Sequence, residues 1–288
     1  MANIKFHSPL RNFRLLALTL TLVLALASLL LAPSAHAQEK APFDPNNAID
    51  SGLGMPSPYD KFLALDQVVP GDGVPWQRHL AEIGVDIDPD AFLDADIHIP
   101  LVLGVRIADG VMAVKARDAE ALNSCATDIE ELARKMGVAD SDLERARRAR
   151  TMANNGEWLR VFMELGFLQQ DIMQKIDAPE NRVRGDLLII SGWMQGLVYT
   201  STVIVEHYSP ETSNFLREPV LAKALLQRAQ SLPQPAAGHP LVAAAAETLK
   251  TVIGFVDIPI DGSIAKADVE TLRDAATSFV NRVRTPSL

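Results

Sequence analysis

The sequence predicts an all-α protein, a multi-helix bundle of about eight or nine helices with two central, nearly all-apolar helices. Apolar residues recur at helical spacing along most of the chain. No stretch alternates with period two over the length of a strand, and no Asn-Gly or Asp-Gly hairpin sits between β-branched runs. Hydrophobic residues make up 48% and charged residues 22% of the 288 residues, which excludes wholesale disorder.

Four amphipathic stripes predict surface helices. They cover residues 76–83, 122–136, 158–176 and 269–283. Pro75 precedes the first stripe, and proline is favoured at the start of a helix. Gly137 follows the second stripe as a C-terminal cap, and Pro179 stops the third.

Two segments, Ile97–Val114 and Leu187–Val205, are apolar on nearly every face. Such helices lie either at the centre of a bundle or inside a membrane. The second segment is long enough to span a bilayer, and Gly192 and Gly196 have the spacing that lets helices approach closely in lipid. Charged side chains interrupt the first segment and polar ones the second, at a high cost in lipid. We therefore expect a water-soluble bundle with two buried central helices. In this bundle the glycines let neighbouring helices pack against the backbone, and Asp186 is expected to be the N-cap of the second helix.

The N-terminal segment predicts export. Residues 1–37 combine three basic residues, the apolar run Leu15–Ala32 and a small-x-small motif at Ala35 and Ala37. This pattern is typical of a cleavable signal peptide, with an uncleaved anchor as the alternative. The expected location is the periplasm or the exterior.

The remaining chain is expected to form one helical domain over 59–288, after a flexible arm at 38–58 that is rich in Pro, Gly, Asn and Asp. Segment 232–240 holds three prolines and a glycine, and it marks a candidate sub-boundary. Cys125 is the only cysteine, so neither an intramolecular disulfide nor a thiolate zinc site can form.

The charge balance excludes one class of partner. The formal charge of −9 becomes −12 once Lys5, Arg11 and Arg14 are removed with the signal segment. A protein with this overall field is a poor ligand for nucleic acid or anionic lipid. The basic run Arg145–Arg150 is a local exception, which we interpret as a solvated helix face rather than an anion site.

Catalytic and metal signatures are missing from the sequence. There is no H-E-x-x-H, phosphate-loop or G-x-S-x-G motif. Aspartates at 86, 88 and 90 have the first spacings of a calcium loop, but Ala91 and Ile97 stand where that loop needs glycine and glutamate. Asp88 is better explained as the cap of a short helix. Nothing along the chain brings any two of its histidines together, so no metal and no cofactor are expected.

Four residues are the candidate binding residues: Arg106, Asp109, Gln195 and His207. Arg106 and Asp109 lie three residues apart on a helix face that the flanking residues predict to be buried. A buried charge is normally paired, either to hold helix register or to serve a function. Gln195 lies in the second apolar segment, and His207 ends it.

These observations favour a non-catalytic exported protein that binds a protein partner or a small apolar ligand between its helices. One alternative is an all-α periplasmic enzyme, for example acting on cell-wall glycan, with Glu157 or Glu164 as its acid. A second alternative is a membrane-associated helical protein. Insertion of the mature chain into a membrane is not expected, and self-association is left open.

Overall fold

A computed structural model describes most of the chain beyond the N-terminal region. The described residues are 62, 65–67, 69, 73–161, 163–164, 181–259 and 261–286. All of them belong to one compact unit, Pro45–Leu288. The predicted signal peptide at 1–37 and the predicted arm at 38–58 lie outside the described residues, so both stay predictions.

The all-α prediction is confirmed, because every regular element of the described residues is a helix. The α-helices are α3 (Trp76–Ile83), α4 (His98–Ala116), α5 (Ala119–Lys135), α6 (Asp140–Asn154), α8 (Arg182–Glu206), α9 (Pro210–Ser213), α10 (Pro219–Gln230), α11 (Pro240–Val256) and α12 (Lys266–Arg284). Short 3-10 turns occupy Pro89–Ala91, Asn214–Leu216 and Ala236–Gly238. Residues 158–164, the start of the third predicted stripe, are also helical where they are described.

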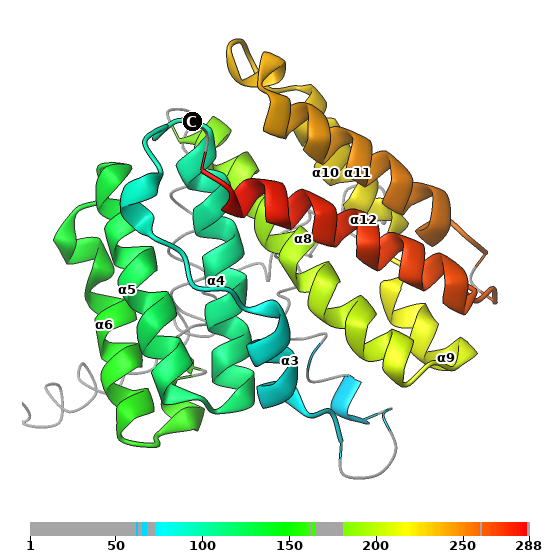
Figure 1. The fold of residues 1–288 in the computed structure, drawn as a ribbon, viewed down its shortest axis with the longest axis horizontal. Coiled ribbons are helices and arrows are strands. Elements are labelled where there is room, and N and C mark those ends of the chain that lie inside the picture. The colour runs from blue at the N-terminus through cyan, green and yellow to red at the C-terminus, as the bar shows by residue number, and fades with distance from the viewer. Residues whose placement is uncertain are drawn as a thin grey trace, which may run out of the picture. The chain divides into compact units, whose positions relative to one another are not determined.

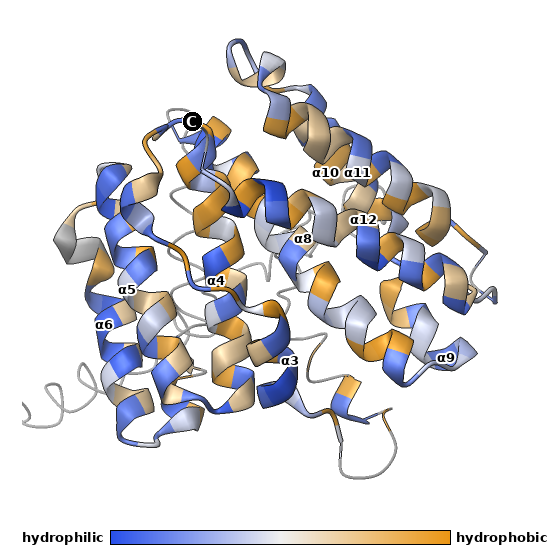
Figure 2. Ribbon diagram, viewed as in Figure 1, coloured by the Kyte–Doolittle hydropathy of each residue, from blue (hydrophilic) through white to orange (hydrophobic). Residues whose placement is uncertain are grey.

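The two apolar segments form the centre of the bundle as α4 and α8, which pack directly against each other (Figure 1). Helix α5 packs on α4, and α6 packs on α5. Helix α12 packs along α8, and α10 and α11 pack against each other, with α11 also against α12. Figure 2 shows α6 as largely hydrophilic, in contrast with the many hydrophobic residues of α4. Burial therefore follows the hydrophobic pattern of each helix.

A pair of glycines allows the central helices to touch through their backbones. A Cβ atom added to Gly104 of α4 would lie 2.2 Å from the Leu188 carbonyl oxygen and 2.2 Å from Ser191 Oγ. A Cβ added to Gly192 of α8 would lie 3.1 Å from the Gly104 carbonyl oxygen. No larger residue fits at Gly104 without a shift of one helix. The prediction that Gly192 packs against a neighbouring backbone is thus confirmed, with Gly104 as the partner that the sequence analysis did not identify.

Helix ends follow the predicted capping residues at two of three positions. Gly137 has a left-handed φ of 81° directly after the C-cap of α5. The Asp88 side chain accepts a hydrogen bond from the Asp90 amide at the start of the short 3-10 turn. The interpretation of Asp186 as the cap of α8 is wrong, because α8 begins at Arg182. Asp186 is instead buried inside the helix and forms an ion pair with Arg228 at 2.5 Å.

Segment 232–240 connects α10 to α11 and contains the 3-10 turn Ala236–Gly238. Leu232 and Ala236 point into the core, with exposed fractions of 6% and 3%. Helix α12, which follows, packs mainly against α8. Residues on both sides of this segment therefore contribute to the same hydrophobic core.

Within the described residues, α8 is the one helix whose length and composition would allow it to cross a membrane, and 83% of its most apolar window is buried in the protein. A central helix of a soluble bundle has the same property. Its burial is consistent with packing against α4 and α12.

Candidate functional site

Six polar side chains meet between the central helices, and we refer to them as the central polar cluster. They are Arg106 and Asp109 of α4, Asp128 of α5, Gln195 and Tyr199 of α8, and Arg284 of α12. Arg106, Asp109, Gln195 and Tyr199 are at most 2% exposed. The cluster thus joins four helices at a place where water is largely excluded.

Asp109 is the centre of this cluster and is fully buried. Its Oδ1 atom accepts hydrogen bonds from Gln195 Nε2 at 2.6 Å and Tyr199 Oη at 2.9 Å. Its Oδ2 atom accepts from Arg106 Nη1 at 3.2 Å and Arg284 Nη2 at 3.0 Å. A carboxylate offers about four lone-pair positions. The acceptor capacity of Asp109 is therefore fully used by the protein itself.

Arg106 links Asp109 to α5 and to the loop that follows α3. Its guanidinium lies 2.6 Å from Asp128 Oδ2 and 3.7 Å from Asp86 Oδ1, and it donates to the Val85 carbonyl at 3.1 Å. Burial raises the pKa of Asp128, and the nearby Arg106 opposes that rise. Two arginines and two buried aspartates therefore compensate one another, as buried charges require.

The neutral groups beside Asp109 are held in their protonated forms. Burial and the Asp109 charge raise the pKa of Tyr199 well above its ordinary value, so Tyr199 remains a hydrogen-bond donor. Burial also raises the pKa of the Cys125 thiol to about 12, although Arg106 opposes that rise. A thiol with this pKa is a poor nucleophile. These groups serve packing and hydrogen bonding better than proton transfer.

The structure brings three of the four candidate binding residues together, since Arg106, Asp109 and Gln195 belong to the central polar cluster. His207 does not join them, because it caps the C-terminal end of α8. The sequence analysis missed Asp128, Tyr199 and Arg284. Tyr199 lies four residues after Gln195 on the same helix face, a spacing that could have identified it. Asp128 and Arg284 reach the cluster only through helix packing.

A second polar group lies where α3 meets the end of α8, and we call it the His79 corner: Arg78, His79, Glu82 and Glu206. His79 is fully buried, and neither ring nitrogen has a hydrogen-bond partner. Its Nε2 atom lies 3.6 Å from Glu206 Oε2. One ligand atom from each of His79, Glu82 and Glu206 falls within 4.8 Å of the others. Burial lowers the pKa of His79, which favours the neutral ring.

The other histidines have separate roles. His98 Nε2 lies 2.7 Å from the Val283 carbonyl oxygen, and the ring packs edge-on against Phe92. His239 Nδ1 accepts a hydrogen bond from the Leu241 amide at the start of α11. His207 lies close enough to His79 for a positive charge on it to lower the pKa of His79. Two of the four histidines beyond the signal segment therefore belong to one region, at or beside the His79 corner.

The acidic stretch that suggested calcium does not converge on one point. Asp86 accepts a hydrogen bond from Ser124, and Asp90 pairs with Lys135. Asp94 accepts hydrogen bonds from the amides of Asp96 and Ile97 just before α4, and the Asp96 carboxylate pairs with Arg184. Among the described residues, the three acceptors of the His79 corner are the one group of histidine and carboxylate ligands with metal-like spacing.

The basic run on α6 is paired with acidic side chains. Arg145 and Arg148 bind Glu164 at 2.6 Å and 3.2 Å, and Arg147 binds Glu130 at 3.4 Å. The hydrogen bond from Arg145 lowers the pKa of Glu164 most, and Arg148 adds to the effect. This arrangement fits the interpretation of the run as a charged helix face.

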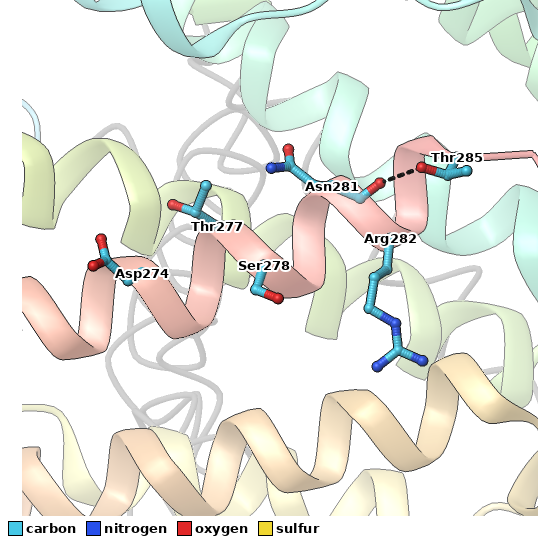
Figure 3. Close-up of a pocket in the computed structure, with 6 residues that line it drawn as sticks. All are labelled: Asp274, Thr277, Ser278, Asn281, Arg282 and Thr285. Atoms are coloured by element: carbon cyan, nitrogen blue, oxygen red, sulfur yellow. Dashed lines mark hydrogen bonds between the residues drawn. The ribbon is translucent and has the colours of Figure 1, made fainter.

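A shallow hollow of about 500 Å³ lies along α12 (Figure 3). Its lining consists of Asp274, Thr277, Ser278, Asn281, Arg282 and Thr285. The first five lie along one face of α12, and Thr285, the C-cap of this helix, donates from Oγ1 to the Asn281 carbonyl at 2.8 Å. Most of them are exposed, so the hollow lacks the enclosed apolar walls of a typical small-molecule site.

No protein family, characterised protein or solved structure matches this chain.

Proposed function

We propose that this chain is a non-catalytic, exported helical protein that acts by binding a protein partner. The observation that carries the non-catalytic part of this proposal is the saturation of Asp109, whose two carboxylate oxygens accept hydrogen bonds from four side chains. A general acid or base needs a proton-exchanging atom that substrate can reach. The central polar cluster supplies structure to the bundle instead.

The enzyme alternative depends on Glu157 or Glu164, and the surroundings of each disfavour it. Glu164 is held ionised by two arginines, whereas a general acid at neutral pH needs a raised pKa. Glu157, which directly precedes the helix that begins at residue 158, forms an ion pair with Arg160 of that helix. Neither carboxylate borders the hollow on α12.

The small-ligand form of the hypothesis needs space between the central helices. The contact between Gly104 and Gly192 fills that space with backbone. The hollow on α12 is shallow and open rather than enclosed, which is unsuited to an apolar ligand. A protein partner therefore fits better than an apolar ligand, and a second copy of this chain is one such partner.

If the chain binds a protein partner, we expect the contact at exposed apolar side chains. Leu159 and Met163 lie four residues apart on one helix and are 74% and 54% exposed, and Leu93 is 86% exposed. Side chains of this kind are enriched in interfaces when they cluster, although single exposed apolar residues are common.

The test is photo-crosslinking in living cells that express the full-length chain. A photoreactive residue at 93, 159 or 163 should give a discrete adduct that contains a second protein or a second copy. The same residue at Glu247, a strongly exposed position on α11, should give none. Absence of adducts at all three apolar positions would contradict the proposal. A small molecule retained in native mass spectrometry of the purified protein would then favour the ligand alternative.

A further inference from the structure

The His79 corner contains a buried ring that packs edge-on against Trp76 but whose two nitrogen atoms no hydrogen bond accounts for. His79 has an exposed fraction of 0%, and both of its ring nitrogens lack hydrogen-bond partners. Leaving buried polar atoms unpaired costs about 1–3 kcal/mol per group. An apolar residue at this core position of α3 would avoid that free-energy cost. A ligand bound to the imidazole would explain why a histidine occupies the position.

Carboxylates face this unpartnered ring from two helices. Glu82 follows His79 by three residues on α3, and Glu206 is the last residue of α8. The ligand atoms of these three residues lie within 4.8 Å of one another, and His79 Nε2 is 3.6 Å from Glu206 Oε2. The bonds of zinc to nitrogen and oxygen measure about 2.0–2.2 Å, so two ligands of one tetrahedral ion lie roughly 3.3–3.5 Å apart. The separation between His79 and Glu206 is close to this value.

We propose that His79, Glu82 and Glu206 bind one divalent transition-metal ion of the zinc type, with the fourth position left to water. Imidazole nitrogen with carboxylate oxygen is a ligand set that suits zinc, whereas calcium takes oxygen ligands only.

Arg78 is the group that competes with the ion. Its guanidinium forms an ion pair with Glu206 Oε2 and lies 3.8 Å from Glu82 Oε1. The Arg78 side chain is 50% exposed, so its guanidinium can turn into solvent. Glu82 is 54% exposed and can rotate toward the ring by the short distance required. In this proposal the metal ion replaces the Arg78 guanidinium beside the carboxylates of Glu82 and Glu206, and the backbone stays in place.

This site departs from the sequence expectation that no metal binds. That expectation depended on spacing along the chain, whereas the site joins α3 to the end of α8, which is far away in the sequence. It is independent of the proposed binding of a partner, because no residue of the His79 corner is among the exposed apolar positions above. Failure of one proposal leaves the other standing.

The decisive experiment is calorimetric titration of Zn²⁺ into untagged protein, purified from cells expressing the full-length chain and freed of metal with a chelator. We expect saturable binding of one ion per chain. Glu82→Gln, Glu206→Gln and His79→Gln should each weaken binding by at least about tenfold, the loss typical of changes at or near a metal site. Glu247→Gln, which removes an exposed carboxylate from an ion pair with Lys250, is the matched control and should bind as the unaltered chain does.

Two further measurements sharpen the result. Co²⁺ in place of Zn²⁺ should give visible absorption bands that disappear in Glu82→Gln, a half-exposed substitution that leaves the core intact even where His79→Gln fails to fold. Arg78→Ala should bind Zn²⁺ more tightly because the competing cation is gone. Three results would overturn the proposal: no saturable binding of Zn²⁺, an affinity of Glu82→Gln and Glu206→Gln equal to that of the unaltered chain, or no gain in affinity in Arg78→Ala.

Discussion

At the scale of single residues, Asp109 connects more of the molecule than any other polar group described above. Its partners come from α4, α8 and α12, and Arg106 extends the connection to Asp128 of α5. A buried carboxylate is costly unless it is paired and fully hydrogen-bonded. Asp109 meets both conditions, which explains how a charge is tolerated in the middle of an apolar helix.

Asp109→Ala should therefore destabilise the protein strongly. The substitution leaves Arg106 and Arg284 buried without their shared counter-charge, and breaking a buried pair in this way costs about 3–5 kcal/mol. The control is Asp274→Ala on α12, whose carboxylate is 68% exposed in its pair with Arg273 and should contribute at most about 1 kcal/mol. Urea unfolding followed by circular dichroism measures both. A loss below about 1 kcal/mol for Asp109→Ala would indicate a carboxylate kept for a ligand rather than for stability.

At the scale of helices, the amphipathic pattern predicts where elements lie better than where they begin. The stripe at 76–83 matches α3, and the two apolar segments match α4 and α8 within a few residues. The start of α8 was misplaced because Asp186 resembles a cap, whereas its carboxylate is compensated by Arg228 from α10. Local sequence does not contain that long-range ion pair.

In the candidate site, too, contacts within one helix could be predicted from the sequence and contacts between helices could not. Arg106 and Asp109 could be predicted to meet because one helix face carries both. Their contact with Arg284 depends on how α12 packs along α8, which no local pattern encodes. The same reason explains why His79 and Glu206 were not predicted to meet. Pairs on one helix are therefore predictable, and pairs across helices require the three-dimensional packing.

Glycine-to-alanine substitution is expected to have opposite effects at two positions, because only one of the two glycines lies in the close contact between α4 and α8. Gly104→Ala should destabilise the protein by about 1–3 kcal/mol or more, because the new methyl group would overlap a backbone carbonyl of α8. Gly254→Ala on α11 meets no atom within 4 Å and should stabilise by about 0.4–1 kcal/mol through reduced entropy of the unfolded chain. Thermal and urea unfolding measure both. Equal effects at the two positions would contradict the close contact between α4 and α8.

The ion pairs between α6 and the helix that follows it predict a dependence on pH. The lowered pKa of Glu164 means that its carboxylate stabilises the folded protein above its ordinary pKa of about 4.3, and that this contribution is lost as the pH falls through the folded value. Glu164→Gln should thus be less stable than the unaltered chain at pH 7, with the difference closing toward pH 3. Unfolding in urea at both pH values measures this.

Double substitutions identify the cause of the difference in stability between Glu164→Gln and the unaltered chain. In the Glu164→Gln background, Arg145→Met and Arg148→Met should cost less than they do alone, because their shared partner is already neutral. If Glu164→Gln is less stable than the unaltered chain by the same amount at pH 3 as at pH 7, Glu164 contributes through packing instead of charge.

At the scale of the whole molecule, two properties bear on where the protein resides. The helices of the described part bury one hydrophobic core, to which α4, α8, α11 and α12 all contribute. The formal charge is −9 for the full chain, and it becomes more negative without the basic segment that precedes the predicted cleavage site. From the buried core and the negative charge we expect weak attraction to anionic membranes, a prediction that the following experiment tests.

Export and solubility can be tested together on the full-length chain produced in a Gram-negative bacterium. We expect a processed protein whose first residue is Gln38, because small residues occupy positions 35 and 37 before that bond. We also expect it in the osmotic-shock fraction without detergent, because α8 is buried among other helices rather than exposed to lipid. Mass spectrometry of the N-terminus and sedimentation of the shock fraction provide the two measurements. An intact Met1 in membrane-bound material would favour an uncleaved anchor, and a chain beginning at Gln38 that still requires detergent would favour α8 as a membrane helix.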